Sequence, residues 1–376
     1  MSDKIRVGLI FGGKSGEHEV SLASAQSVLS ALDPNKYDAV LIGVTKEGKW
    51  LTGGNPLKQL MRATQSPLLK ATNGVNANSA STAMVSHSAT EMTTADALNE
   101  SVDVVFPLIH GPNGEDGTIQ GLLELADLPY VGAGVAASAV GMDKALMKAL
   151  FQNAGLPVVE YLVVARHKWE HEPEETIHEI ETAIQYPCFV KPANLGSSVG
   201  VTKAHNWDEL TQALATAALY DRKIIVERAV EAREVECSVL GNDAPVASLP
   251  GEVIPEREFY DYDAKYADEN TRLIIPADLT DEQIRTVQEL AVRAFRAIDC
   301  CGMARVDFFI EKRDEIPKRD GRVILNEINT IPGFTAVSMY PKMWEASGLS
   351  YPQLIERLLQ LALERHADRT RNRVTY

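Results

Sequence analysis

Two alternating apolar segments near the C-terminus, residues 303–310 and 322–328, constrain the fold more than any other feature of this sequence. Alternation with a period of two predicts β-strands, and the polar linker between the segments contains Gly and Pro, as the turn of an antiparallel hairpin does. In the second strand the same alternation places Glu327 opposite Ile324 and Ile328. The sequence therefore predicts a hairpin with one apolar and one polar face.

The polar face of this hairpin carries the ligands of a hard cation. Asp307, Glu327 and Asn329 offer only oxygen atoms, and neither His nor Cys lies nearby, so Mg²⁺ is favoured and zinc is disfavoured. Arg305 shares the face of Asp307 and adds a fixed positive charge, and the Pro-Gly turn after the second strand offers backbone N–H groups to an anion. The alternative is a solvated face without a metal.

Length, charge and cysteine content limit the class of protein. A chain of 376 residues predicts two or three domains of about 100 to 200 residues each. The formal charge of −15 argues against nucleic acid and acidic lipid surfaces as partners. No apolar run approaches the roughly 18 residues of a membrane helix, and no signal peptide is recognisable. The four cysteines lack metal-site spacing, so we expect reduced thiols in a cytoplasmic protein.

The N-terminal region has the pattern of an open parallel α/β sheet. Residues 5–11 form a nearly continuous apolar run, a Gly-rich turn follows, and apolar residues then recur at helical spacing up to about residue 32. The next strand is predicted at 39–44. Glu17 falls in the first turn of the helix, beside the positive end of its dipole.

One nucleotide-binding pattern in this region is misleading. Residues 8–15 satisfy G-x-x-x-x-G-K-[ST] letter for letter. A P-loop needs its first glycine at the end of a strand, whereas Leu9, Ile10 and Phe11 are predicted to lie inside one. We therefore expect Lys14 to be exposed and to bind no phosphate.

A second candidate loop follows the strand predicted at 102–109. Before it, residues 64–99 are rich in Ala, Ser, Thr and Asn and are interpreted as a low-complexity insertion. The loop begins at His110 and ends at Gly117, ahead of a helix. Ligands of α/β sheets bind at such strand ends, so His110 either contacts an anionic substrate or only braces its loop.

The central region begins with Asp143, which is expected to cap a helix that ends near Asn153. Strands at 158–164 and 187–191 then flank a helix. Lys191 opens the sequence Lys-Pro-Ala-Asn-Leu-Gly-Ser-Ser-Val-Gly, whose backbone N–H groups would cover phosphates; an ordinary hairpin turn is the alternative.

The chain continues with strands predicted at 223–227 and 235–240 and a segment, 255–272, that is dense in charge and tyrosine. We interpret this segment as a lid, with Lys265 and Tyr266 able to reach a phosphate and a reacting group. Thr280 opens a helix with a capping box, and that helix should cover the sheet of the hairpin. A final helix is expected to fray from Arg365 onward.

Taken together, these motifs closely resemble the D-alanine–D-alanine ligases of bacterial cell-wall synthesis. The resemblance covers nearly the whole chain outside 64–99, and it rests on the order and spacing of motifs that are modest individually. They are Glu17-His-Glu-Val-Ser21, His110-Gly with Gly-Glu-Asp-Gly117, Met142-Asp-Lys144, Lys191-Pro with Gly-Ser-Ser-Val-Gly200, Tyr262 with Lys265-Tyr266, Arg305-Val-Asp307 and Asn326-Glu-Ile-Asn-Thr-Ile-Pro-Gly333.

The resemblance implies a three-domain ATP-grasp fold of the α/β (α+β) class, with an N-terminal open parallel α/β domain at 1–143, a central domain at 144–226 and a C-terminal domain at 227–376. It implies a homodimer that uses ATP, D-alanine and two Mg²⁺ or Mn²⁺ ions. The implied catalytic residues are Glu17, Ser197, Tyr266, Lys265, Arg305 and Gly333. The implied ATP-binding residues are Lys144, Lys191, Ser198, Glu227, Val230 and Glu234. Asp307, Glu327 and Asn329 would hold the metal ions, and His110, Ser338 and Met339 would bind the substrates.

Three alternatives to this function are open from the sequence. An ATP-binding module without catalysis would lack the pair Arg305 and Tyr266, and a two-metal phosphohydrolase would need neither the Gly-Ser-Ser loop nor a lid. Within the ligases, the competing product is the D-alanine–D-lactate ester. The resemblance implies that ester-forming relatives carry Phe at the position of Tyr266, which favours the peptide product here.

Overall fold

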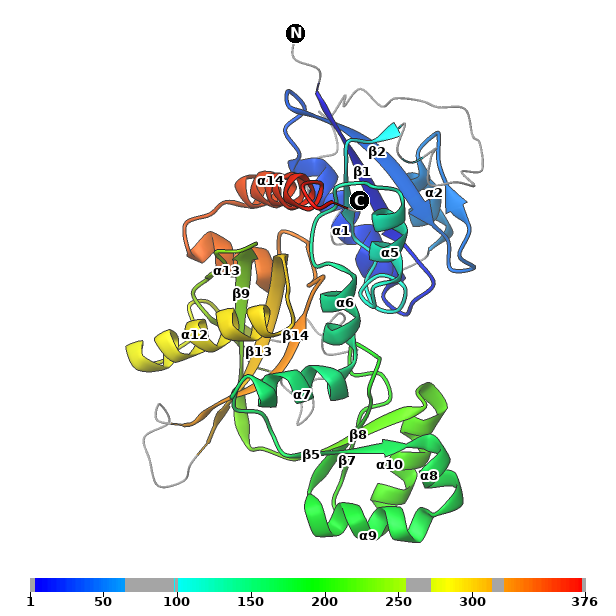
Figure 1. The fold of residues 1–376 in the computed structure, drawn as a ribbon, viewed down its shortest axis with the longest axis vertical. Helices are drawn as coiled ribbons and strands as arrows, with labels where there is room; N and C mark the ends of the chain where they lie inside the picture. The colour runs from blue at the N-terminus through cyan, green and yellow to red at the C-terminus, as the bar shows by residue number, and fades with distance from the viewer. Residues whose placement is uncertain (1–3, 65–97, 99–100, 255–271, 313–320, 374–376) are drawn as a thin grey trace.

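The computed structural model describes residues 4–64, 98, 101–254, 272–312 and 321–373, and the strands among them form three sheets. Figure 1 shows the N-terminal sheet at one end of the molecule, a six-stranded sheet in the middle and a smaller sheet at the other end. Most of the predicted insertion at 64–99 and of the predicted lid at 255–272 lies outside the described residues, as do Lys265 and Tyr266.

The N-terminal sheet has the strand order β3-β2-β1-β4, and its core is parallel as predicted. The strands are β1 (Ile5–Gly12), β2 (Tyr37–Val44), β3 (Trp50–Leu51) and β4 (Val104–Pro107), and the helices are α1 (His18–Ala31), α2 (Pro56–Ala63) and α5 (Thr118–Leu125). Leu9, Ile10 and Phe11 are fully buried inside β1, whereas Lys14 is exposed. Both observations agree with rejection of the P-loop.

The smaller sheet is antiparallel, with the order β5-β8-β6-β7. Its strands are β5 (Tyr161–Ala165), β6 (Cys188–Pro192), β7 (Thr202–Ala204) and β8 (Lys223–Arg228), and its helices are α8 (Arg166–His171), α9 (Pro173–Ala183) and α10 (Trp207–Tyr220). Apolar residues of α9 and α10, among them Ile177 and Leu210, pack on the sheet to form its core. The loop between β6 and β7 contains the Gly-Ser-Ser sequence.

The six-stranded sheet has the order β12-β11-β9-β13-β14, and β10 pairs with β9. Its strands are β9 (Ala232–Gly241), β10 (Val246–Ala247), β11 (Gly251–Ile254), β12 (Arg272–Ile274), β13 (Gly302–Glu311) and β14 (Val323–Asn329). The antiparallel pairing of β13 with β14 confirms the predicted hairpin. The helices around it are α6 (Val135–Met142), α7 (Lys144–Asn153), α12 (Asp281–Ala297), α13 (Met339–Ala346) and α14 (Tyr351–Arg369).

Two predicted helix caps are confirmed. Thr280 and Gln283 form a capping box at the start of α12, and α12 packs on the sheet of the hairpin through Val287, Ala291 and Ala294. At the start of α7, the carboxylate of Asp143 accepts hydrogen bonds from the backbone amides of the first turn. Each cap satisfies amides that a helix start leaves without a partner.

The prediction that Ile324 and Ile328 share one face of β14 is wrong. The register changes after the pair Asp307 and Glu327, because Phe308 pairs with Leu325 and leaves Asn326 as an extra residue. An extra residue reverses the alternation on one side of a bulge. Ile328 and Leu325 therefore belong to the core beneath α12, and Ile324 does not.

The prediction that the chain frays from Arg365 is also wrong. Helix α14 continues to Arg369, and Arg365 donates hydrogen bonds to the carbonyls of Gly132, at 2.5 Å, and Tyr130, at 3.1 Å. Its guanidinium lies 4.1 Å from the centroid of the Tyr130 ring. Figure 1 shows α14 beside the N-terminal sheet, so the last helix of the chain lies against the region formed by its first strands.

The domain limits stay a prediction. The limit at residue 226 falls within β8, and Met147 and Phe151 of α7 belong to the core of the six-stranded sheet.

Within the described ranges, no helix is long and apolar enough to cross a membrane. The four cysteines are free thiols, and Cys188, Cys237 and Cys300 are buried.

Candidate functional site

Three carboxylates lie in one row across the six-stranded sheet. Asp307 of β13 pairs with Glu236 of β9 on one side and with Glu327 of β14 on the other. Residues in such register have neighbouring side chains on the same face. The sequence predicted Asp307 and Glu327 as site residues. It did not predict Glu236, because only the pairing of β9 with β13 brings Glu236 next to Asp307.

Arg305 lies among these carboxylates. Its Nε donates to Oδ1 of Asp307, and a terminal nitrogen donates to Oδ2, both at 2.7 Å. The same Nε lies 3.1 Å from Oε2 of Glu236. Burial by itself would lower the pKa of Arg305, but Asp307 and Glu236 hold it well above its ordinary value. The guanidinium is thus a fixed positive charge inside the site.

The predicted metal ligands lie next to one another. Nδ2 of Asn329 donates to Oδ2 of Asp307 at 2.9 Å, and the strand register places Glu327 beside Asp307. Across the described ranges, no group of three or more His, Cys, Asp and Glu side chains is arranged as a metal site. The predicted set contains two carboxylates and one amide, and these hard oxygen donors fit Mg²⁺ or Mn²⁺.

A buried cluster of two lysines and a glutamate adjoins the hairpin. Glu227 of β8 is 2% exposed. Its Oε2 accepts a hydrogen bond from Lys191 at 2.7 Å, and its Oε1 lies 3.1 Å from Nζ of Lys148. Burial would raise the pKa of Glu227, but the two lysines lower it to about 2. Lys148 also donates to the carbonyl of Asn326, the extra residue of the bulge, at 3.2 Å.

The other predicted ATP-binding residues border this cluster. Lys144 of α7 donates to the carbonyl of Leu195 at 2.8 Å and lies 3.6 Å from Glu327. Val230 and Glu234, both half-buried, lie in the β8–β9 connection and near the start of β9. Lys148 was missed in the sequence, where it reads as an ordinary polar position of α7; only its contact with Glu227 distinguishes it.

The Gly-Ser-Ser loop reaches the N-terminal sheet. Oγ of Ser197 donates to Oε1 of Glu17 at 2.5 Å. Ser197 and Ser198 have φ angles of 50° and 58°, in the left-handed region that non-glycine residues seldom adopt. Gly200 has a φ of 72°, and a Cβ there would lie 2.7 Å from the Tyr220 ring. Such backbone strain is concentrated at functional loops.

The first substrate-binding candidates are held by loops that follow β1 and β4. Glu17 is the last residue before α1, and its backbone amide donates to Oγ of Ser15, which in turn donates to the carbonyl of His110. The His110 ring is 3% exposed. Its Nδ1 lies 3.0 Å from the carbonyl of Ile331, and its Nε2 lies 3.2 Å from Oγ of Ser24.

The contact with Ile331 and the lowered pKa together indicate the state of His110. Nδ1 faces an acceptor, so it carries the proton, and Nε2 accepts from Ser24. Burial lowers the pKa of His110, although Glu17 opposes this effect. A neutral ring with both nitrogens engaged braces the loop against the turn after β14. Contact of His110 with a substrate, which the sequence predicted, stays a proposal.

Glu115 is a further residue that sequence reasoning missed, although it belongs to the quoted Gly-Glu-Asp-Gly motif. Its Oε2 accepts a hydrogen bond from the amide of Gly111 at 2.7 Å. Burial, and then the charge of Glu17, raise the pKa of Glu115 to about 8. A second carboxylic acid, Glu115, thus lies beside Glu17.

The turn after β14 supplies the last predicted residues. Ser338 precedes α13, and its Oγ accepts a hydrogen bond from the amide of Thr335 at 3.1 Å. A Cβ on Gly333 would lie 3.3 Å from Oγ of Ser338, so the two residues are adjacent. Met339 is buried in the first turn of α13. The amides at this helix start form a suitable site for a carboxylate.

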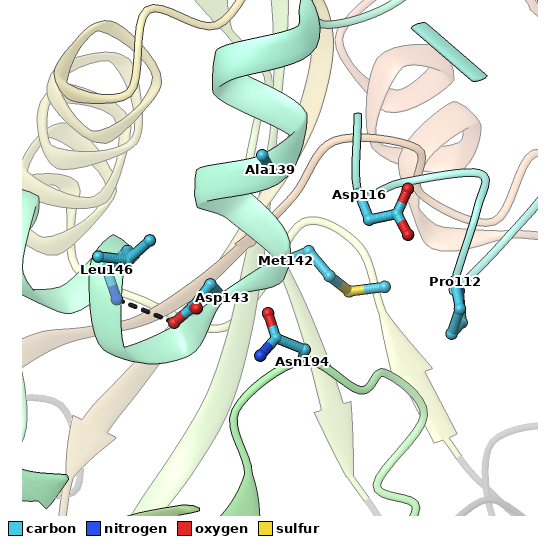
Figure 2. A pocket seen from close by; sticks show the side chains of 7 residues that line it. All are labelled: Pro112, Asp116, Ala139, Met142, Asp143, Leu146 and Asn194. Atoms are coloured by element: carbon cyan, nitrogen blue, oxygen red, sulfur yellow. Dashed lines mark hydrogen bonds between the residues drawn. The ribbon is translucent and has the colours of Figure 1, made fainter. Parts of the chain in front are cut away.

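A cavity of about 420 Å³ lies near the site, and Figure 2 shows its lining. Its polar side chains already have partners. Asp143 caps α7, as the dashed line to Leu146 indicates, and it binds Lys223 at 2.5 Å. Asp116 accepts hydrogen bonds from two backbone amides, and Asn194 binds Asp221. Among the residues that the structure describes, no predicted catalytic residue lines this cavity, so we assign it no chemistry.

Comparison with known proteins identifies the family. The family model described as "D-ala D-ala ligase N-terminus" matches residues 6–133, and "D-ala D-ala ligase C-terminus" matches residues 150–360. The chain is 51% identical to the D-alanine--D-alanine ligase of Heliobacterium modesticaldum, with 98% of this chain and 97% of that protein covered. It is 48% identical to that of Geobacillus kaustophilus, with 97% and 96% covered.

Solved structures agree with this result. The D-alanine-D-alanine ligase from Coxiella burnetii superposes with a TM-score of 0.80 at 36% identity, covering 98% of this chain and 97% of that one. The VanG D-Ala:D-Ser ligase from Enterococcus faecalis gives 0.79 at 34% identity, covering 96% and 100%. This chain therefore belongs to the D-alanine–D-alanine ligase family and has its ATP-grasp fold.

Proposed function

We propose that this protein is an ATP-dependent ligase that joins two D-alanines into D-alanyl-D-alanine through a D-alanyl phosphate, for peptidoglycan precursors. The hydrogen bond between Ser197 and Glu17 carries the proposal within the site. It places a phosphate-type loop of the central region against a carboxylate of the N-terminal sheet. Glu17 would bind the ammonium of the first D-alanine, so the contact would bring the nucleotide loop to the carboxylate substrate, as formation of an acyl phosphate requires.

The nucleotide would bind between the smaller sheet and the six-stranded sheet. Lys144 and Lys191 would contact its phosphates, Glu227, Val230 and Glu234 its adenine and ribose, and Ser198 would lie in the covering loop. The ion pairs of Lys144 with Glu327 and of Lys191 with Glu227 support this assignment, because a bound phosphate would replace each carboxylate as the anionic partner of its lysine. Domains at 1–143, 144–226 and 227–376 would then enclose the nucleotide and the two alanines.

Asp307, Glu327 and Asn329 would hold two Mg²⁺ or Mn²⁺ ions. Bound there, the ions would neutralise charge on the oxygens of the transferring phosphoryl group. The support is the shared register of the two carboxylates and the hard donor set.

Bond formation would occur in two steps. A carboxylate oxygen of the first D-alanine attacks the γ-phosphorus, and ADP leaves. The neutral amine of the second D-alanine then attacks the acyl carbon, loses a proton, and inorganic phosphate leaves. Arg305 and the backbone amide of Gly333 would stabilise the tetrahedral oxyanion between attack and departure. Holding the reactants in line supplies much of the remaining rate.

The alanines would be oriented by charge. Glu17 would bind the ammonium of the first D-alanine, and the start of α13 at Ser338 and Met339 would bind the carboxylate of the second. His110 would hold the surrounding loop against the turn after β14. As the resemblance to the ligases implies, Lys265 would reach the transferred phosphoryl group and Tyr266 would join the chain of Ser197 and Glu17 when the lid excludes water.

Phosphate release with and without D-alanine tests the function. A ligase releases phosphate only with D-alanine and forms the dipeptide stoichiometrically. Release without D-alanine would identify a phosphohydrolase, and ATP binding without release would identify a non-catalytic module. Product analysis with D-lactate as competitor separates the peptide from the ester. We further propose a cytoplasmic homodimer, which light scattering after gel filtration tests.

A further inference from the structure

Glu236 has no role in the proposed reaction, yet it lies beside Arg305 and Asp307, which do. It is 8% exposed on β9, in register with Asp307. Its Oε2 lies 3.1 Å from Nε of Arg305. A carboxylate this deeply buried is seldom retained without a charged partner, and the guanidinium is that partner.

The two carboxylates beside Arg305 compete for it. Arg305 donates to both oxygens of Asp307. The same oxygens would be the ligands of a cation, so Arg305 and the cation would compete for them. A buried guanidinium that lost Asp307 and had no second partner would be strongly unfavourable. Glu236, on the opposite side from Glu327, supplies the second partner.

We propose that Glu236 is a positioning residue that keeps Arg305 in place when Asp307 turns its oxygens to a divalent cation. This inference rests on the proposed metal site. Glu236 lowers the free-energy difference between the arrangement with Arg305 on Asp307 and the arrangement with Arg305 on Glu236. It thereby frees a ligand for the cation without displacing the group that faces the oxyanion.

Glu236→Gln tests the proposal because it removes one negative charge with little change in shape. Arg305 then has Asp307 as its principal carboxylate, and a cation must compete with a stronger pair. We expect the affinity for Mn²⁺ to fall on the order of 10-fold or more, as for other groups that orient metal ligands. The signal of free Mn²⁺ in electron paramagnetic resonance, in ADP-saturated protein with a protein-free blank, measures this directly. The maximal rate at saturating Mn²⁺ should fall less than the Mn²⁺ affinity.

Glu252→Gln is the matched control. Glu252 is 5% exposed on the neighbouring strand β11 and binds Arg233 with both oxygens at 2.7 Å. It is a buried carboxylate of the same sheet whose ion pair lies away from Asp307. A purely structural effect of removing a buried charge would appear in both variants, whereas loss of Mn²⁺ affinity should appear only at Glu236.

A second variant, Glu236→Asp, tests the proposal if Glu236→Gln does not fold. Glu236→Asp keeps the charge, so its Mn²⁺ affinity should lie between those of the wild type and Glu236→Gln, or near the wild type. Equal Mn²⁺ affinity in the wild type and in each folded Glu236 variant would overturn this inference and leave the ligase proposal intact. A wild type that binds no Mn²⁺ in the presence of ADP would overturn both the metal site and the role of Glu236.

Discussion

Lys148 and Glu227 form an ion pair that is almost completely buried, with their side chains 1% and 3% exposed and Nζ 3.1 Å from Oε1. Lys148→Met should lower the free energy of unfolding by about 3 kcal/mol, because it leaves Glu227 with Lys191 as its remaining lysine partner in the low-dielectric interior. Urea denaturation measures this. Lys168→Met is the control, since its pair with Glu179 is exposed and is worth about 1 kcal/mol or less. Equal losses in the two variants would refute a special role for burial.

The raised pKa of Glu115 predicts how stability varies with pH. Burial, and then the charge of Glu17, raise the pKa of Glu115 from its ordinary value of 4.5 to about 8. Between pH 4.5 and about 8, Glu115 holds a proton in the folded protein that it has released in the unfolded chain. The free energy of unfolding therefore falls as pH rises, and Glu115 contributes at most about 1.4 kcal/mol per pH unit to this fall.

Glu115→Gln removes that titration, so its stability should fall less steeply from pH 5 to pH 8. Urea unfolding at each pH gives the slope, and Glu345→Gln at an exposed position of α13 is the control. Parallel curves for the wild type and Glu115→Gln would contradict the prediction.

The metal assignment predicts a large loss of activity without loss of the fold. Glu327→Gln removes a negative ligand and keeps the shape, so the turnover number should fall on the order of 100-fold or more. Circular dichroism checks the fold, and exposed Glu289→Gln on α12 should behave as the wild type. Near-normal turnover in folded Glu327→Gln would remove Glu327 from the site.

Exposed Lys14 should have no part in ATP binding. We expect Lys14→Ala to leave the Michaelis constant for ATP unchanged, whereas Lys191→Ala should raise it at least 10-fold, about 1.4 kcal/mol if that constant reports affinity. Steady-state kinetics with varied ATP distinguish the two. A 10-fold increase in Lys14→Ala would restore the P-loop interpretation.

Tyr266 should set the choice of nucleophile. Tyr266→Phe removes a hydroxyl that we propose, from the resemblance to the ligases, lies beside Ser197 and Glu17, and polar networks discriminate substrates more strongly than shape. Ester formation from D-lactate should then rise relative to peptide formation. The effect should be largest below neutral pH, where D-alanine is almost wholly ammonium. An unchanged product ratio from competing D-alanine and D-lactate at roughly pH 6 to 9 would show that Tyr266 does not set this choice.

Local pattern determined much of this protein in advance. The run at β1 and the alternation in β13 and β14 predicted strands, and Asp143 and Thr280 predicted helix starts, because each depends on residues a few positions apart. The same alternation placed Arg305 and Asp307 on one face. The resemblance to the ligases followed from the order of such local motifs.

Tertiary structure alone decided the relationships between distant segments. The bulge at Asn326 moved Ile324 out of the core beneath α12, since register depends on the partner strand. Burial of Lys148 against Glu227, the row from Glu236 to Glu327 and the contact of Arg365 with Gly132 each join residues far apart in the chain. A polar residue in a sequence does not reveal whether water or a buried charge will be its partner, because packing of separate elements makes that choice.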